Sequence, residues 1–136
     1  MTKKSETFKE LMNRAEGNLF SLLFKAKEDA HITHLMQPTQ SYSDHIALNI
    51  FYDEMDDLTD KLVEMYYGIN GPNNEPIKFT SKVIEEPLSS YFRSLLKNIQ
   101  NKRIKYTEAY MTAQLDEIEM LISRTIYRLE NTRSNV

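Results

Sequence analysis

The chain has 136 residues, 40% of them hydrophobic, a length that predicts a single domain, residues 1–136, around one core. The absence of cysteine excludes disulfides and thiolate metal sites, and the net charge of −3 does not favour a general nucleic-acid-binding surface. No apolar run approaches the roughly 20 residues that span a bilayer, and none follows the N-terminus as in a signal peptide, so we expect a cytoplasmic protein without a membrane partner.

Apolar residues spaced three and four apart predict a first helix over residues 5–34. The apolar stripe begins at Phe8 and continues to Ala30. Gly17 falls inside this helix and is expected to weaken it by roughly 1 kcal/mol relative to alanine. Pro38 then ends the helix, because its ring cannot continue the helical backbone.

The second helix is predicted over residues 42–68 and has two opposed faces. One face is apolar and is expected to pack into the core; it consists of Leu48, Phe51, Met55, Leu58, Leu62 and Met65. The other face is polar and nearly all acidic; it consists of His45, Asn49, Asp53, Asp57, Asp60 and Glu64. Such a face is commonly just hydrated, but aligned acids repel one another, and a bound cation would remove that cost. Gly68 is expected to end the helix.

A long connection follows, since residues 69–76 are rich in turn-forming residues. Residues 77–86 permit a strand, but a lone strand has no partner, so a short helix or an extended segment across a bundle end is expected. Further helices are predicted over residues 87–101 and 107–131. Four long amphipathic helices predict an all-α four-helix bundle, with its long connection between helices two and three, and such bundles commonly hold metal sites.

All three histidines of the chain fall within fifteen residues: His31, His34 and His45. The first two helices should lie antiparallel, because their connection is short, and this would bring the histidines to one end of the molecule. Imidazole together with carboxylates is a ligand set that iron, manganese or zinc accepts. The simpler interpretation is that these are polar residues around a turn.

The spacing of these residues resembles the Dps-like branch of the ferritin superfamily. In that family a histidine ends the first helix, a second lies in helix two, and an Asp-x-x-x-Glu pair begins fifteen residues after the second. Here His31 corresponds to the first histidine and His45 to the second, and Asp60-x-x-x-Glu64 has the required spacing. The resemblance covers roughly residues 19–131.

Within this branch, the chain is most similar to small Dps-like proteins encoded by tailed phages. The similarity rests on the His-x-x-His turn at His31 and His34 and on the segment from Ser41 to Leu48, Ser-Tyr-Ser-Asp-His-Ile-Ala-Leu. A phage-encoded protein would act in the host cytoplasm. No catalytic residue is assigned beyond the metal ligands.

The resemblance implies a ferritin-like bundle that forms a homo-oligomer, either a dimer or a larger shell, with a ferroxidase centre across a two-fold interface. It implies that His31 or His34 with His45 comes from one subunit and Asp60 with Glu64 from its mate, binding iron, manganese or zinc. The full candidate ligand set is His31, His34, His45, Asn49, Asp60 and Glu64.

Two departures from the family change these expectations. Asn49 stands where the family has an aspartate, so it supplies a carbonyl oxygen without charge, and the affinity for a second iron should fall. Weak ferroxidase or storage activity is therefore a lesser expectation than metal binding. The N-terminal arm has few lysines, so DNA binding is not expected. The alternative is a non-enzymatic phage-encoded oligomer that binds or modulates a host protein.

Overall fold

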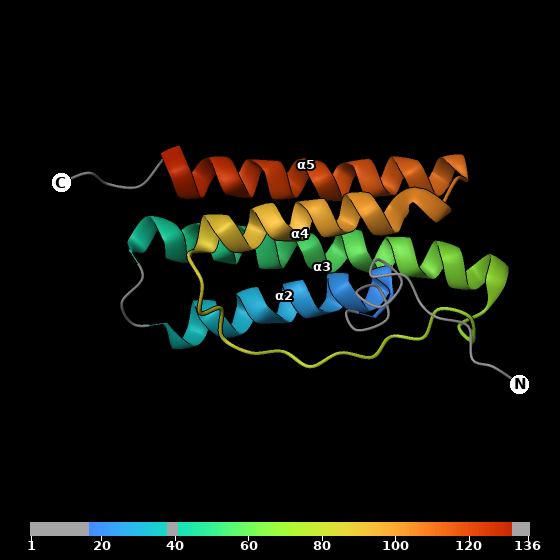
Figure 1. The fold of residues 1–136 in the computed structure, drawn as a ribbon, viewed down its shortest axis with the longest axis horizontal. Coiled ribbons are helices and arrows are strands. Elements are labelled where there is room, and N and C mark those ends of the chain that lie inside the picture. Colours follow the sequence, from blue (N-terminus) through green and yellow to red (C-terminus); the bar gives the residue numbers. More distant parts are fainter. Residues whose placement is uncertain (1–16, 38–40, 132–136) are drawn as a thin grey trace, which may run out of the picture.

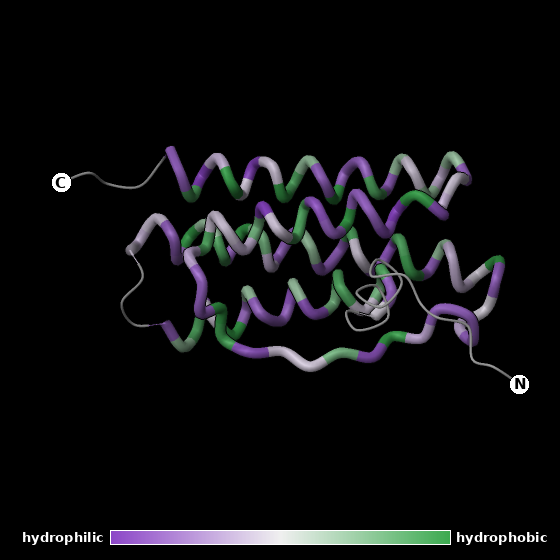
Figure 2. Tube along the Cα trace, in the orientation of Figure 1, coloured by the Kyte–Doolittle hydropathy of each residue, from purple (hydrophilic) through white to green (hydrophobic). Residues whose placement is uncertain are grey.

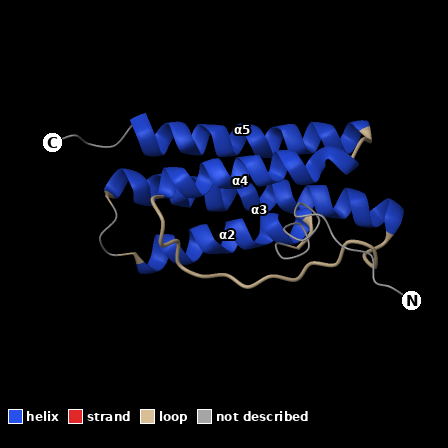
Figure 3. Cartoon of the chain, in the orientation of Figure 1, coloured by secondary structure: helices blue, strands red, loops and turns tan. Residues whose placement is uncertain are grey.

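A computed structural model describes residues 17–37 and 41–131 of the chain. The described residues form helices joined by loops, with no strand among them (Figures 1 and 3). The predicted all-α bundle of four long helices is confirmed, and no described helix is long and apolar enough to cross a membrane. The elements are α2 (Leu19–Met36), α3 (Tyr42–Asn70), α4 (Leu88–Lys102), the short 3-10 turn η1 (Arg103–Lys105) and α5 (Ala109–Asn131).

The four helices lie side by side with one long crossover (Figure 1). α3 runs antiparallel to α2, as predicted, and α5 runs antiparallel to α4. α4 runs in the same direction as α3, so the chain must return the full length of the bundle between them. Residues 71–87, here called the crossover, make that return along α2.

Two glycines differ from their predicted roles. Gly17 is not inside a helix: its φ is +81°, and α2 begins after Asn18, whose side chain accepts a hydrogen bond from the Ser21 N–H at 2.8 Å. A helical backbone cannot continue through that φ, so the predicted helix over 5–34 is wrong at this point, and residues 5–16 lie outside the described residues. Gly68 does not end α3, because the left-handed residue there is Gly71, with φ +74°.

The two faces of α3 are as predicted. The buried side chains of its apolar face fill the core between α2 and α5; among the predicted residues these are Leu48, Phe51, Met55 and Leu62. Leu58 and Met65 are only half-buried, so they lie at the edge of that face rather than at its centre. The four acids of the polar face are all exposed, and we call them the acidic stripe: Asp53, Asp57, Asp60 and Glu64. Figure 2 shows apolar positions recurring along each helix.

The crossover is extended, as one of the two predicted alternatives had it, but it lies along α2 rather than across a bundle end (Figure 1). Side chains of α2 take the place of a partner strand. The backbone N–H groups of the crossover donate to α2 side-chain oxygens in three places: Lys78 to Ser21 Oγ at 2.9 Å, Lys82 to Asp29 Oδ1 at 2.9 Å, and Ile84 to Thr33 Oγ1 at 2.8 Å. These bonds satisfy backbone groups that otherwise need a sheet or water.

Candidate metal-binding residues

The end of α2 and the start of α3 bring two of the three histidines together. Ser41 caps α3, since its Oγ accepts from the Asp44 N–H at 3.1 Å, and this fixes the start of the helix that carries His45. The rings of His34 and His45 stack, with their centroids 3.9 Å apart and their planes 22° apart. His34 is therefore the histidine whose ring contacts His45; which of His31 and His34 binds metal with His45 stays a prediction.

The geometry of this stack restricts what it can bind. The lone pair of an imidazole nitrogen lies in the ring plane, so an ion in the plane of one ring lies outside the plane of the other. Nδ1 of His34 lies 3.2 Å from the backbone oxygen of His45. A carbonyl oxygen only accepts, so this contact assigns the proton of His34 to Nδ1 and the lone pair to Nε2. As placed, the two rings do not chelate one ion together.

His31 has a different ring partner. Its ring stacks on Tyr52 with a centroid distance of 3.9 Å and an interplanar angle of 15°. Its Nδ1 is 3.9 Å from the Glu28 carboxylate one turn earlier on α2. His31 lies one turn before His34 on α2, at the same end of the molecule as predicted, but its ring packs on Tyr52 and takes no part in the stack of His34 on His45.

The two predicted carboxylate ligands, Asp60 and Glu64, lie far from the histidines within a single chain. Asp60 is fifteen residues beyond His45 on the same helix, a separation of roughly 22 Å at 1.5 Å per residue. Asn49, one turn from His45, is half-buried, whereas Asp60 and Glu64 are exposed. Among the residues described in one chain, no group of three or more histidine and acidic side chains could hold a metal ion. A site that uses both parts of α3 therefore needs a second subunit.

A buried carboxylate on α2 was missed by the sequence analysis. Asp29 is 1% exposed, and its side chain accepts from Lys25 Nζ at 2.5 Å, from the Tyr91 hydroxyl at 2.9 Å and from the Lys82 N–H at 2.9 Å. It thereby ties α2 to α4 and to the crossover. Burial, followed by the Asp29 carboxylate, raises the pKa of Tyr91 well above its ordinary value, so this phenol keeps its proton.

Lys27 is a second buried polar residue that the sequence analysis did not predict. It is 6% exposed, its Nζ lies 2.9 Å from Asp56 of α3, and the same ammonium is 4.5 Å from the centre of the Phe24 ring. The sequence signal for both residues was the interruption of an alanine-rich stripe by Lys27 and Asp29. Lys27 and Asp29 are bound to residues of other elements, so they have a structural role and are not candidate metal ligands.

Comparison with known proteins gives one match. Residues 34–129 match the family described as "Family of unknown function (DUF5856)", and the search of curated proteins and that of solved structures gave none. The matched residues include α3, the crossover, α4 and nearly all of α5, and every candidate ligand except His31. Since the match covers most of the chain, the protein belongs to the DUF5856 family.

Proposed function

We propose that the protein is a ferritin-like oligomer that binds a divalent metal ion, iron, manganese or zinc, between two subunits. The observation that carries the proposal is the outward orientation of the acidic stripe on the helix that also holds His45. Aligned carboxylates on a solvent-facing helix repel one another, and a cation or a cationic neighbour relieves that repulsion. The donor set, imidazole with carboxylates, is one that these ions accept.

A two-fold pairing of α3 helices supplies the missing ligands. When two copies of one helix pack antiparallel, residues that face each other have numbers with a constant sum. His45 faces the partner subunit's Asp60 or Glu64 when that sum is 105 to 109, which puts the two-fold axis near Asp53. The same register sets Asn49 opposite the partner subunit's Asp57. Two equivalent sites result, each with an imidazole from one subunit and carboxylates from the other.

The bundle topology supports the same proposal by analogy. Helices α3 and α4 run parallel and are joined by one long crossover, which is the connectivity of ferritin-like bundles. Fold analogy alone does not assign an activity, so the proposal stops at metal binding. Asn49 adds no negative charge where the Dps-like pattern has an aspartate, which favours one ion per site over the pair of irons that oxidation chemistry requires.

The test combines mass and metal content. Native mass spectrometry of the purified protein, titrated with Zn(II) and, without oxygen, with Fe(II), should show at least a dimer that gains one ion per subunit. Because the ligands come from two subunits, metal should stabilise the dimer by mass action. The response should weaken as the pH falls through the histidine range, since protonated imidazole cannot ligate.

Matched variants distinguish metal binding at the proposed site from nonspecific binding to other surface carboxylates. His45→Ala combined with Glu64→Ala should abolish the metal response, whereas Glu117→Ala, at an exposed acid of α5, should leave it unchanged. The register has its own test because the chain lacks cysteine: Asp53→Cys should form a disulfide-linked dimer on oxidation with diamide, and Glu117→Cys should not. A metal-free monomer would overturn the proposal and favour a non-enzymatic protein whose acidic stripe contacts a host protein.

A further inference from the structure

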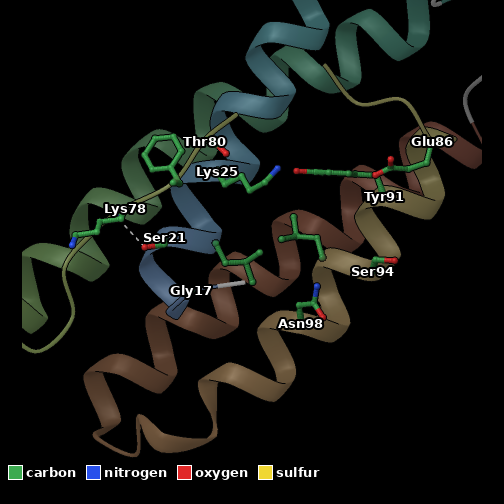
Figure 4. A pocket seen from close by; sticks show the side chains of 12 residues that line it. Gly17, Ser21, Lys25, Lys78, Thr80, Glu86, Tyr91, Ser94 and Asn98 are labelled. Atoms are coloured by element: carbon green, nitrogen blue, oxygen red, sulfur yellow. Dashed lines mark hydrogen bonds between the residues drawn. The ribbon is translucent and has the colours of Figure 1, made fainter. Parts of the chain in front are cut away.

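A groove separates α2 from α4 on the side that the crossover borders (Figure 4). It encloses about 870 Å³, which is ample for several large side chains. Leu22, Phe79 and Leu95 give it apolar walls, and Phe79 is 40% exposed there. Polar groups such as Ser94 and Asn98 of α4 form its rim. α2 packs mainly on α3 and α4 packs mainly on α5, and α2 and α4 touch each other in few places.

The chain enters the described structure at one end of this groove. Gly17 lines the groove and has a φ of +81°, a conformation that suits glycine and that an α-helix does not contain. Its backbone oxygen accepts from Lys102 Nζ at 2.7 Å, which ties the entry point to the end of α4. The backbone at Gly17 therefore does not continue the helical path of α2. The point where the chain enters the described residues lies against the groove.

The sequence before Gly17 has the pattern of an amphipathic helix, whose apolar face would need a partner. Phe8, Leu11, Met12 and Ala15 recur at three- and four-residue steps, which is one face of a helix. The opposite side carries Glu6, Glu10 and Asn13. A helix over residues 5–16 would be roughly 18 Å long, which is enough to cover the part of α4 that lines the groove, Tyr91 to Asn98, roughly 10 Å.

We propose that residues 5–16 of the same chain dock in the groove between α2 and α4 and place their apolar face on Leu22, Phe79 and Leu95. The segment is joined to the groove through Gly17 itself, so its effective concentration there exceeds that of any untethered competitor. A second copy of the chain or a separate ligand would have to displace it. Docking would complete the wall between α2 and α4 and cover the exposed ring of Phe79.

Engineered cysteines test this arrangement without interference, because the chain has none of its own. Ser94→Cys on the groove rim is combined in turn with Phe8→Cys, Leu11→Cys, Met12→Cys or Ala15→Cys in the full-length protein, which is then oxidised and mapped by peptide mass spectrometry. At least one pair should give a disulfide within the chain. Lys97→Cys, an exposed position of α4 that does not line the groove, is the matched control and should give only background.

A pair of substitutions supplies a readout that does not depend on disulfide geometry. Leu11→Asp puts a charge on the apolar face, so it should lower the melting temperature and increase the binding of a hydrophobic dye to the groove. Asn13→Asp, on the opposite side of the same segment, should change neither. The proposal is overturned if no pair with position 94 links within the chain, if links form only between chains, or if Leu11→Asp behaves like Asn13→Asp.

Discussion

Removing the buried carboxylate of Asp29 should destabilise the protein more than any single acid of the polar face of α3. Asp29→Ala deletes the acceptor for three donors that come from three parts of the fold: Lys25 of α2, Lys82 of the crossover and Tyr91 of α4. The side chain is 2% exposed and its bonds to Lys82 and Tyr91 are part-buried, so water reaches the donors left behind only in part. The crossover should lose its central attachment to α2.

The loss in free energy of unfolding can be estimated from what each of the three donors loses. The Lys82 N–H and the Tyr91 hydroxyl lose an acceptor in a part-buried position, at about 1–3 kcal/mol each. The side chain of Lys25 is 37% exposed and can return its ammonium to water, so it adds little. Alanine improves helix propensity over aspartate by roughly 0.5 kcal/mol, which offsets part of the loss. The net destabilisation should be roughly 2–5 kcal/mol, or on the order of 10–20 °C in melting temperature.

Urea unfolding followed by circular dichroism measures the free energy, and hydrogen exchange measures the local effect. The Lys82 amide should exchange faster in Asp29→Ala than in wild type even under native conditions. Asp57→Ala is the matched control, since it makes the same substitution in a helix at an exposed position, and it should fall within about 0.5 kcal/mol of wild type. If Asp29→Ala loses no more stability than Asp57→Ala, the carboxylate does not hold the crossover in place.

Two further predictions concern the core and the alkaline limit. Leu62→Ala should lower the free energy of unfolding by about 2–5 kcal/mol because Leu62 is fully buried. Leu58→Ala should lower it clearly less because Leu58 is half-buried. Equal losses in urea unfolding would contradict the difference in burial between these two leucines. The raised pKa of Tyr91 means that the folded protein binds this proton more tightly than the unfolded chain does, so the stabilisation is present below the unfolded pKa of about 10 and is lost as the pH rises above it. Tyr91→Phe should therefore flatten the decline in stability above about pH 10, as thermal melts at increasing pH can measure, and an unchanged slope would refute it.

The helices could be predicted because their signals are local. On α3 the apolar and acidic residues alternate with helical period, and the structure buries the first set and exposes the second. The ends were less certain. Two glycines, Gly68 and Gly71, lie near the end of α3, and only the backbone conformation decides which one terminates the helix.

The role of α2 could not be predicted in the same way, because it depends on contacts between distant residues. Ser21, Asp29 and Thr33 look like ordinary polar positions in the sequence, yet each receives a backbone N–H from a segment more than fifty residues away. Nothing in the composition of residues 77–86 indicates that their partner is a helix side rather than a strand. The stacking of His34 on His45 likewise follows from the relative rotation of α2 and α3, which periodicity does not determine.

These contacts also limit where the protein can meet a partner. On α2 three polar side chains are bound internally: Asp29 and Thr33 by the crossover, and Lys27 by Asp56. The acidic stripe of α3 is exposed, and it shares no residue with the groove between α2 and α4. The two proposals can therefore fail separately. Loss of the metal response in the His45 and Glu64 double variant would leave the docking of residues 5–16 untouched, and a groove without its segment would leave α3 free to pair about Asp53.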